Sequence, residues 1–175
     1  MFCFYGDIMK KILDFPDGSR QIGEGFCGSN ALKHIILYKH GLNVPETSLM
    51  NIACGSRKNG ISVRGITKIA EKFNLDYNLK CNSSISDVID SIKGENPALL
   101  LIQAWPNKKI SDWSNTWEFG HYVVAIGYDK KKDRLNYYDP IDGKKKNLSY
   151  KKLVKIWHDK DSENVYHNFG MFFKN

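Results

Sequence analysis

The apolar residues of this chain change their spacing once, near residue 97, and that change limits the folds the chain can adopt. Before residue 97 they recur at helical spacing, which predicts helices from Cys27 to about His40, over 63–73 and over 85–92. After residue 97 they form short runs typical of strands, at 97–102, 122–128, 135–138 and 170–173. Helices followed by strands, without regular alternation between the two, predict an α+β fold built on an antiparallel sheet.

Capping and turn residues predict where several of these elements begin and end. Gly41 is expected to end the first helix, and Asp142-Gly143 is expected to form a tight turn. The other expected boundaries are Pro45 before a short helix, Ser84 or Ser86 before the helix at 85–92, and Ser149 before a last helix that holds Leu153, Val154 and Trp157.

The length of the chain fits a single domain with a sizeable core. Its 175 residues, 42% of them hydrophobic, are typical of a compact protein rather than a disordered one. Residues 1–20 are interpreted as an extended N-terminal lead-in that ends in a turn at 15–18, and residues 21–175 as one domain. We see neither a signal sequence nor a run of about 20 apolar residues, so we expect a cytoplasmic protein without a membrane span.

The net charge of +7 raises the question of an anionic partner. Much of the basic charge lies in lysine clusters at 130–132, 144–146 and 151–152, which are interpreted as solvated turn tips and a helix face. Proteins that bind single-stranded nucleic acid interleave basic with aromatic residues, and these clusters do not. A nucleic-acid partner is therefore not expected. The sequence leaves the oligomeric state open.

The four cysteines, at positions 3, 27, 54 and 81, are widely spaced. They include no C-x-x-C pair, so neither a structural zinc site nor a redox motif is expected. Their spacing does not resemble a disulfide framework either. Reduced thiols are therefore expected, which suits an enzyme that uses one of them as a nucleophile.

Cys27 is the candidate nucleophile. It lies at the start of a predicted helix, where free backbone N–H groups and the helix dipole favour an anion and lower the pKa of a thiol. Gly25 and Gly28 on either side allow a tight bend and the close approach of a substrate carbonyl. The alternative is that Cys27 is a buried small hydrophobic residue, as most lone cysteines are.

His121, Asp139 and Gln21 complete a candidate thiol site. His121 begins an apolar strand and Asp139 ends the next one, so the carboxylate is expected to orient the imidazole that takes the thiol proton. Gln21 lies six residues before Cys27 and is expected to donate its side-chain amide to an oxyanion, beside the Cys27 N–H. The alternatives are that His121 is an ordinary edge-strand residue, that Gln21 is a surface amide, and that Asp139 only starts a turn. In the last case Asp142 would be the orienting carboxylate.

The other four histidines are less suited to the role of the base. His34 and His40 lie on or just beyond the predicted Cys27 helix and do not readily face back to its start. His158 and His167 are expected in the last helix and the loop after it. Only His121 begins a strand whose neighbour ends in a carboxylate.

The chain resembles the bacteriocin-processing (double-glycine leader) peptidases, a branch of the papain-like cysteine peptidases. The resemblance rests on an ordered set of motifs, namely Gln21, Cys27-Gly28, Gly120-His121-Tyr122 and Asp139-Pro140. The runs at 101–105, 120–129 and 157–159 are similar to those of a standalone group of such domains. The resemblance implies a papain-like fold, in which a helical half carries the nucleophile and a sheet half carries the histidine and the aspartate. It also implies that Cys27 is the nucleophile, His121 the base, Asp139 the orienting carboxylate and Gln21 the oxyanion donor, with no metal or organic cofactor.

The function predicted from these residues is hydrolysis of a peptide or protein substrate through a thioester acyl-enzyme. Acyl transfer and glutamine deamidation remain alternatives, because they run through the same thioester. A third alternative is a peptide-binding module without catalysis. Trp113 and Trp117 lie in a long loop at 105–119, and we expect them either to line a substrate groove or to pack that loop.

Overall fold

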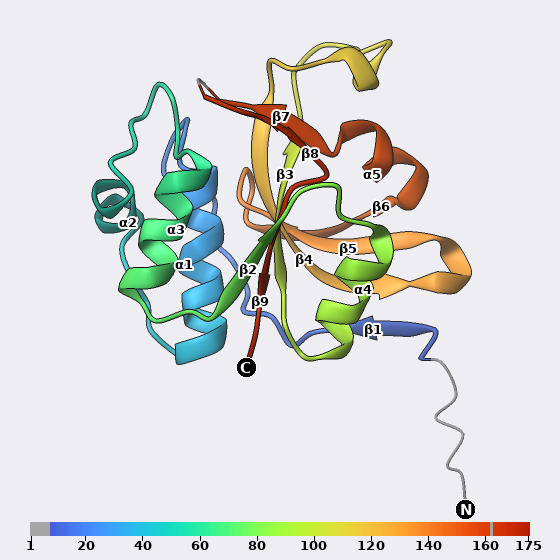
Figure 1. Ribbon diagram of the computed structural model, residues 1–175, viewed down its shortest axis with the longest axis horizontal. Helices are drawn as coiled ribbons and strands as arrows, with labels where there is room; N and C mark the ends of the chain where they lie inside the picture. The colour runs from blue at the N-terminus through green and yellow to red at the C-terminus, as the bar shows by residue number, and fades with distance from the viewer. Residues whose placement is uncertain (1–7, 162) are drawn as a thin grey trace, which may run out of the picture.

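A seven-stranded antiparallel sheet organises the computed structural model, which describes residues 8–161 and 163–175 (Figure 1). The strand order is β2-β9-β3-β4-β5-β6, and β1 pairs with the far end of β4, where Lys10 lies opposite Asp129. The strands are β1 (Lys10–Ile12), β2 (Tyr77–Lys80), β3 (Ala98–Gln103), β4 (Gly120–Asp129), β5 (Arg134–Asp139), β6 (Lys144–Ser149) and β9 (Gly170–Phe173). A separate hairpin consists of β7 (His158–Lys160) and β8 (Val165–His167).

The helices form two groups beside the sheet (Figure 1). The first group is α1 (Cys27–His40), α2 (Glu46–Ile52) and α3 (Val63–Lys72), and the second is α4 (Ile85–Lys93) and α5 (Tyr150–Ile156). Short 3-10 turns lie at η1 (Trp113–Asn115) and η2 (Lys130–Lys132). Within residues 8–161 and 163–175, no helix combines the length and the apolar character that crossing a bilayer requires.

Capping residues set several helix boundaries, and Gly41, Pro45, Ser84 and Ser149 are the ones that the sequence predicts. The Ser62 hydroxyl accepts a hydrogen bond from Gly65 N at the start of α3, and Ser84 forms a capping box with Asp87 at the start of α4. The start at Ser84 rather than Ser86 resolves the alternative left by the sequence. Gly41 ends α1 in the left-handed region, at φ 67°, with its N–H bonded to Leu37 O.

The core lies on both faces of the sheet, because β3 and β4 alternate their side chains between two helical layers. All six residues of β3 are buried. Leu99 and Leu101 belong to the cluster that packs α1 and α3, whereas Leu100 and Ile102 belong to the cluster that packs α4 and α5. A strand covered on both faces reads as a continuous apolar run, which is why 97–102 is recognisable in the sequence.

The lysine-rich strand β6 was not predicted. Residues 144–146 were expected to be solvated at a turn tip. Lys144 and Lys145 are exposed, but the three residues begin β6, which pairs with β5 so that Lys144 lies opposite Asp139. Edge strands often carry lysine, and β6 is the outermost strand on its side of the sheet. The expected turn at Asp142-Gly143 is confirmed, with Gly143 at φ 70° joining β5 to β6.

The C-terminal region also differs from expectation. The last helix ends at Ile156, so His158 and His167 lie on paired strands β7 and β8 rather than on a helix and a loop. Trp157 leaves the helix to fill the core, where its indole N–H donates to Phe169 O at 2.9 Å. Val154, expected on the apolar face, is exposed.

From residue 8 on, the N-terminal lead-in is extended and packed against the sheet, and its first seven residues lie outside the described part of the chain. Residues 10–12 form β1, and the side chains of Leu13 and Phe15 are buried. Gln21 N then donates to Pro140 O at 2.8 Å, which joins the end of the lead-in to the turn after β5. A domain boundary at residue 20 stays a prediction.

Candidate active site

Cys27 is the first residue of α1, at a helix start that carries no capping side chain. The residue before it, Phe26, makes no side-chain capping bond, and the first turn contains no acidic residue. The helix dipole and the first N–H groups of α1 are therefore not neutralised by a neighbouring carboxylate. This is a position that favours a thiolate.

The start of α1 packs directly against β4. A Cβ on Gly28 would lie 3.0 Å from Cδ2 of Tyr122, so the absence of a side chain allows the helix to approach the strand. Burial raises the pKa of the Cys27 thiol, but the hydrogen bond and the positive charge of His121 outweigh this effect and hold the pKa below its usual value. The backbone N–H groups of Tyr122 and Gly28 act in the same direction.

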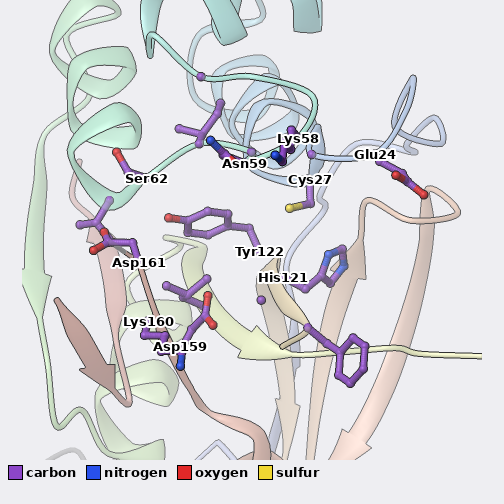
Figure 2. A pocket seen from close by; sticks show the side chains of 18 of the residues that line it. Glu24, Cys27, Lys58, Asn59, Ser62, His121, Tyr122, Asp159, Lys160 and Asp161 are labelled. Atoms are coloured by element: carbon purple, nitrogen blue, oxygen red, sulfur yellow. The ribbon is translucent and has the colours of Figure 1, made fainter. Parts of the chain in front are cut away.

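His121 contacts both Cys27 and Asp139. Its Nε2 lies 2.8 Å from Asp139 Oδ1, which leaves Nδ1 as the ring nitrogen available to Cys27. Figure 2 shows the Cys27 side chain above the His121 ring, with Tyr122 beside both. Burial disfavours the imidazolium, but Asp139 and Cys27 outweigh burial and raise the pKa of His121 to about 9. Both shifts favour the charged forms, a thiolate on Cys27 beside an imidazolium on His121.

Asp139 is fully buried and accepts four hydrogen bonds. The first oxygen, Oδ1, accepts from His121 Nε2 and from Ile141 N, at 2.8 and 3.1 Å. The second, Oδ2, accepts from Trp105 Nε1 and from Lys146 Nζ, at 2.8 and 2.9 Å. Burial raises the pKa of this carboxyl, but His121, Lys146 and Ile141 N outweigh burial and hold the pKa well below its usual range.

Asp142, the alternative to Asp139, lies beyond it. Its Oδ2 contacts Lys146 Nζ at 2.9 Å and its Oδ1 accepts from Lys144 N at 3.2 Å. Asp142 therefore joins the site through Lys146 rather than through His121. Of the two aspartates, the structure brings Asp139 to the imidazole.

Gln21 lies in the wall of the same cavity as Cys27. Its Nε2 donates to Gly23 O at 2.7 Å, which uses one of the two amide hydrogens. Its Oε1 is buried without a hydrogen-bond partner. The glutamine is therefore not the surface amide that the sequence left as an alternative.

A buried polar network holds the Gln21 segment in place. Glu46 Oε2 accepts from Ile22 N at 3.1 Å, and Glu46 Oε1 accepts from Asn30 Nδ2 at 2.9 Å. Asn30 Oδ1 in turn accepts from the Tyr138 hydroxyl at 2.7 Å. The network joins the start of α2, the body of α1 and the end of β5, and the sequence analysis did not find it because its members are far apart in the chain.

The cavity has a volume of about 1030 Å³ and lies between the helical half and the sheet half. One wall contains Gln21, Cys27 and the loop at 54–62, and the other contains the start of β4 and the β7–β8 hairpin. Gly25 is required where the first wall folds on itself, because its φ is +75° and a Cβ there would lie 2.5 Å from Arg57 O.

The two tryptophans of the long loop have different roles. Trp117 lines the cavity and packs on His158, with ring centroids 4.4 Å apart. Trp113 packs on Trp105 at 6.2 Å and under the Lys152 ammonium. The groove interpretation therefore suits Trp117, and the packing interpretation suits Trp113.

Asp159 is a cavity residue to which the sequence analysis gave no role. It lies beside Gly120, is buried, and accepts from Gln103 Nε2 at 2.7 Å. Burial, with the nearby charge of Asp161, raises the pKa of Asp159 to about 6. Figure 2 places both aspartates around Tyr122, whose hydroxyl points away from His121.

The sheet flanked by a helical half, with a cysteine at a helix start facing a histidine on a strand, defines a cysteine peptidase of the papain-like fold. Residues 18–170 match the family model described as Peptidase_C39 like family. The chain therefore belongs to this family. A comparison with curated proteins gave no match.

Solved structures support the same fold. A putative C39-like peptidase from Bacillus anthracis matches with a TM-score of 0.73 and 18% identity, over 96% of this chain and 98% of the other. A double glycine motif protease from the AMS/PCAT transporter, in complex with its leader peptide, matches with a TM-score of 0.60 and 17% identity, over 93% of each chain. The bromelain protease from Ananas comosus matches with a TM-score of 0.57 and 14% identity, over 95% of this chain and 99% of the other.

Proposed function

We propose that the protein hydrolyses peptide bonds with Cys27 as the nucleophile. The observation that carries the proposal is the placement of His121, which is hydrogen-bonded to the buried Asp139 and borders the same cavity as Cys27, close enough for His121 and Cys27 each to shift the pKa of the other. The Cys27 thiolate attacks the scissile carbonyl carbon, and the carbonyl oxygen becomes an oxyanion. The His121 imidazolium then protonates the leaving amine, and a thioester forms on Cys27.

Deacylation uses the same histidine in its neutral form. His121 takes a proton from water as the water oxygen attacks the thioester carbonyl, and the tetrahedral intermediate then expels Cys27 as a thiolate beside the imidazolium. The acid product loses its proton to solvent and leaves as a carboxylate. Asp139 keeps the imidazole in place and stabilises the imidazolium in both halves of the cycle.

Two donors are available for the oxyanion. The backbone N–H of Cys27 lies in the first turn of α1, where no helical carbonyl precedes it. The second donor is the Gln21 side chain, which borders the cavity and has one amide hydrogen not engaged by Gly23. Donors of this kind stabilise the transition state more than the substrate.

The proposed substrate is a peptide bound between the two walls of the cavity. The leader-peptide complex of the transporter protease supports this class of substrate, since that protein shares the fold. Trp117 and Tyr122 supply aromatic surface along the cavity, and the loop at 54–62 supplies backbone groups.

The test is turnover of a mixture of synthetic peptides, read by mass spectrometry, for the wild type and for Cys27→Ala. We expect new termini with the wild type and none with Cys27→Ala, while Cys81→Ala, at an exposed thiol, keeps wild-type activity. Full activity of Cys27→Ala would overturn the proposal. Cross-linked products would indicate acyl transfer, and conversion of glutamine to glutamate would indicate deamidation.

A further inference from the structure

Asp139 is held by two cations, of which His121 is only one. The second is Lys146 on β6, whose Nζ lies 2.9 Å from Asp139 Oδ2 and 2.9 Å from Asp142 Oδ2. Its side chain is about one-third exposed, whereas Asp139 is fully buried. Charges therefore alternate in sign from Asp142 through Lys146, Asp139 and His121 to Cys27.

The two oxygens of Asp139 serve different partners. Oδ1 faces His121 and Ile141 N, and Oδ2 faces Lys146 and Trp105 Nε1. A carboxylate bonded only through Oδ1 is free to rotate about its Cβ–Cγ bond. The bonds to Oδ2 remove this freedom, so Oδ1 stays directed at the imidazole.

The charge of Lys146 has an effect beyond orientation. A cation on Oδ2 reduces the negative potential that Asp139 presents to His121, because like charges at short range oppose one another. Trp105 also donates to Oδ2, but its indole carries no net charge. The two donors to Oδ2 therefore differ in net charge, so variants of Lys146 and Trp105 can separate the effect of the charge from the effect of the hydrogen bond.

We propose that Lys146 is a positioning residue of this site, which fixes Asp139 through Oδ2 and sets how firmly His121 holds its proton. The inference rests on the proposed function for its catalytic consequence. Trp105 also fixes the orientation of Asp139, but it does not affect how firmly His121 holds its proton. The lysine is thus part of the machinery of the site rather than a solvated member of a basic cluster.

Other ionisable groups surround the pair and must be considered. They are Cys27 of α1, Tyr137 and Tyr138 of β5, Asp142 of the following turn, and Asp159 of β7 behind Gly120. Burial raises the pKa of both tyrosines, so they stay neutral in the range concerned. Asp159 is present in every variant below, and its effect cancels in the comparison. Asp142 loses its Lys146 partner in Lys146→Met, and its unpaired negative charge then acts on His121 in the same direction as that of Asp139.

The test compares Lys146→Met, Lys146→Arg and Trp105→Phe with Lys145→Met. Lys145 is the neighbouring residue on β6 and pairs with the exposed Asp17, so its variant controls for loss of a nearby surface cation. The readouts are kcat and KM for a cleaved peptide from pH 5 to 10. For Lys146→Met we expect a several-fold lower kcat, an unchanged KM, and an alkaline limb displaced upward by roughly half a pH unit.

The other variants separate charge from shape. We expect Lys146→Arg to restore the alkaline limb, Trp105→Phe to lower kcat with a much smaller displacement, and Lys145→Met to match the wild type. An unmoved alkaline limb in a folded Lys146→Met protein would overturn the proposal. So would a Lys146→Arg variant as displaced as Lys146→Met.

A second measurement does not depend on turnover. In Cys27→Ser protein, an NMR titration of the His121 ring with and without Lys146→Gln reports how firmly the imidazole holds its proton. We expect the His121 titration to move to higher pH when the lysine charge is removed, and an unchanged titration would contradict the proposal. If peptides are not cleaved at all, the proposed function fails while this titration still decides the role of Lys146.

Discussion

His121 meets Asp139 through Nε2, at 2.8 Å, and this leaves Nδ1 as the ring nitrogen directed at Cys27. The tautomer in which Nε2 carries its proton toward Asp139 is therefore the one that can accept the thiol proton at Nδ1. Asp139 selects that tautomer, although it touches neither the thiol nor the substrate.

Asp139→Asn is expected to lower kcat/KM by roughly 10²- to 10⁴-fold, because a neutral amide does not stabilise the imidazolium charge and can also turn its NH2 group toward Nε2, which selects the wrong tautomer. The pKa of His121 should fall, since its main anionic partner is lost. Steady-state kinetics check the loss. Asp142→Asn is the matched control, because it removes a carboxylate from the same turn without removing the contact to His121, and an equal loss in both variants would contradict the assignment.

Cys27 is expected to react with iodoacetamide faster than the other thiols at pH 6 to 7. Its pKa is lowered, so the thiolate is present below the pH at which an ordinary thiol ionises. His121→Ala removes the hydrogen bond and the charge that lower the pKa, and labelling of Cys27 should then shift to higher pH. Peptide mapping by mass spectrometry measures labelling at each site, with the exposed Cys54 and Cys81 as internal references.

Gln21→Ala is expected to reduce kcat by roughly 10²- to 10³-fold with little change in KM, because an oxyanion donor acts mainly in the transition state. Its thiol labelling should stay at the wild-type rate, since Gln21 is not among the groups that shift the pKa of Cys27. Glu24→Ala, at another residue of the same cavity wall, is the control. Wild-type kcat in Gln21→Ala would remove Gln21 from the mechanism.

Asp159→Asn is expected to stabilise the protein above about pH 6. The pKa of this carboxyl is raised from 3.8 to about 6 in the folded state, because the folded protein favours the protonated form. Its contribution to the free energy of unfolding is therefore fully present below the unfolded pKa and is lost as the pH rises through about 6. An amide does not ionise and still accepts from Gln103. The melting temperature of the variant should exceed that of the wild type at pH 8, and the gap should close toward pH 4. Asp17→Asn, at a fully exposed carboxylate, should show no such trend.

The parts of the fold that local pattern determines were predictable. Helices α3 and α4 begin at serine caps, and β3 is a continuous apolar run, so each can be recognised from adjacent residues. Cys27, His121 and Asp139 could be selected because each lies at the end of a predicted element. The three residues were expected to lie close together. The packing of α1 on β4 brings Cys27 near His121, and the pairing of β4 with β5 brings Asp139 to His121.

The partners of Asp139 could not be predicted from local pattern. Whether a lysine in the run 144–146 is solvated or reaches a buried carboxylate depends on the register of β6 against β5. Trp105 reaches the same carboxylate from the end of β3, and nothing in its neighbours marks it apart from Trp113. Register and strand order arise from packing over the whole sheet, so these contacts appear only in three dimensions.

Cys27 belongs to α1, whereas His121 and Asp139 belong to β4 and β5, so the reactive pair spans the boundary between the helical half and the sheet half. A small separation of the two halves would therefore inactivate the enzyme before any helix or strand unfolds. On heating, activity should be lost before the far-ultraviolet circular dichroism signal. Conversely, an electrophile that is bonded to Cys27 and contacts β4 would hold the two halves together across that boundary. Such an inhibitor should raise the melting temperature while leaving every native hydrogen bond as it was.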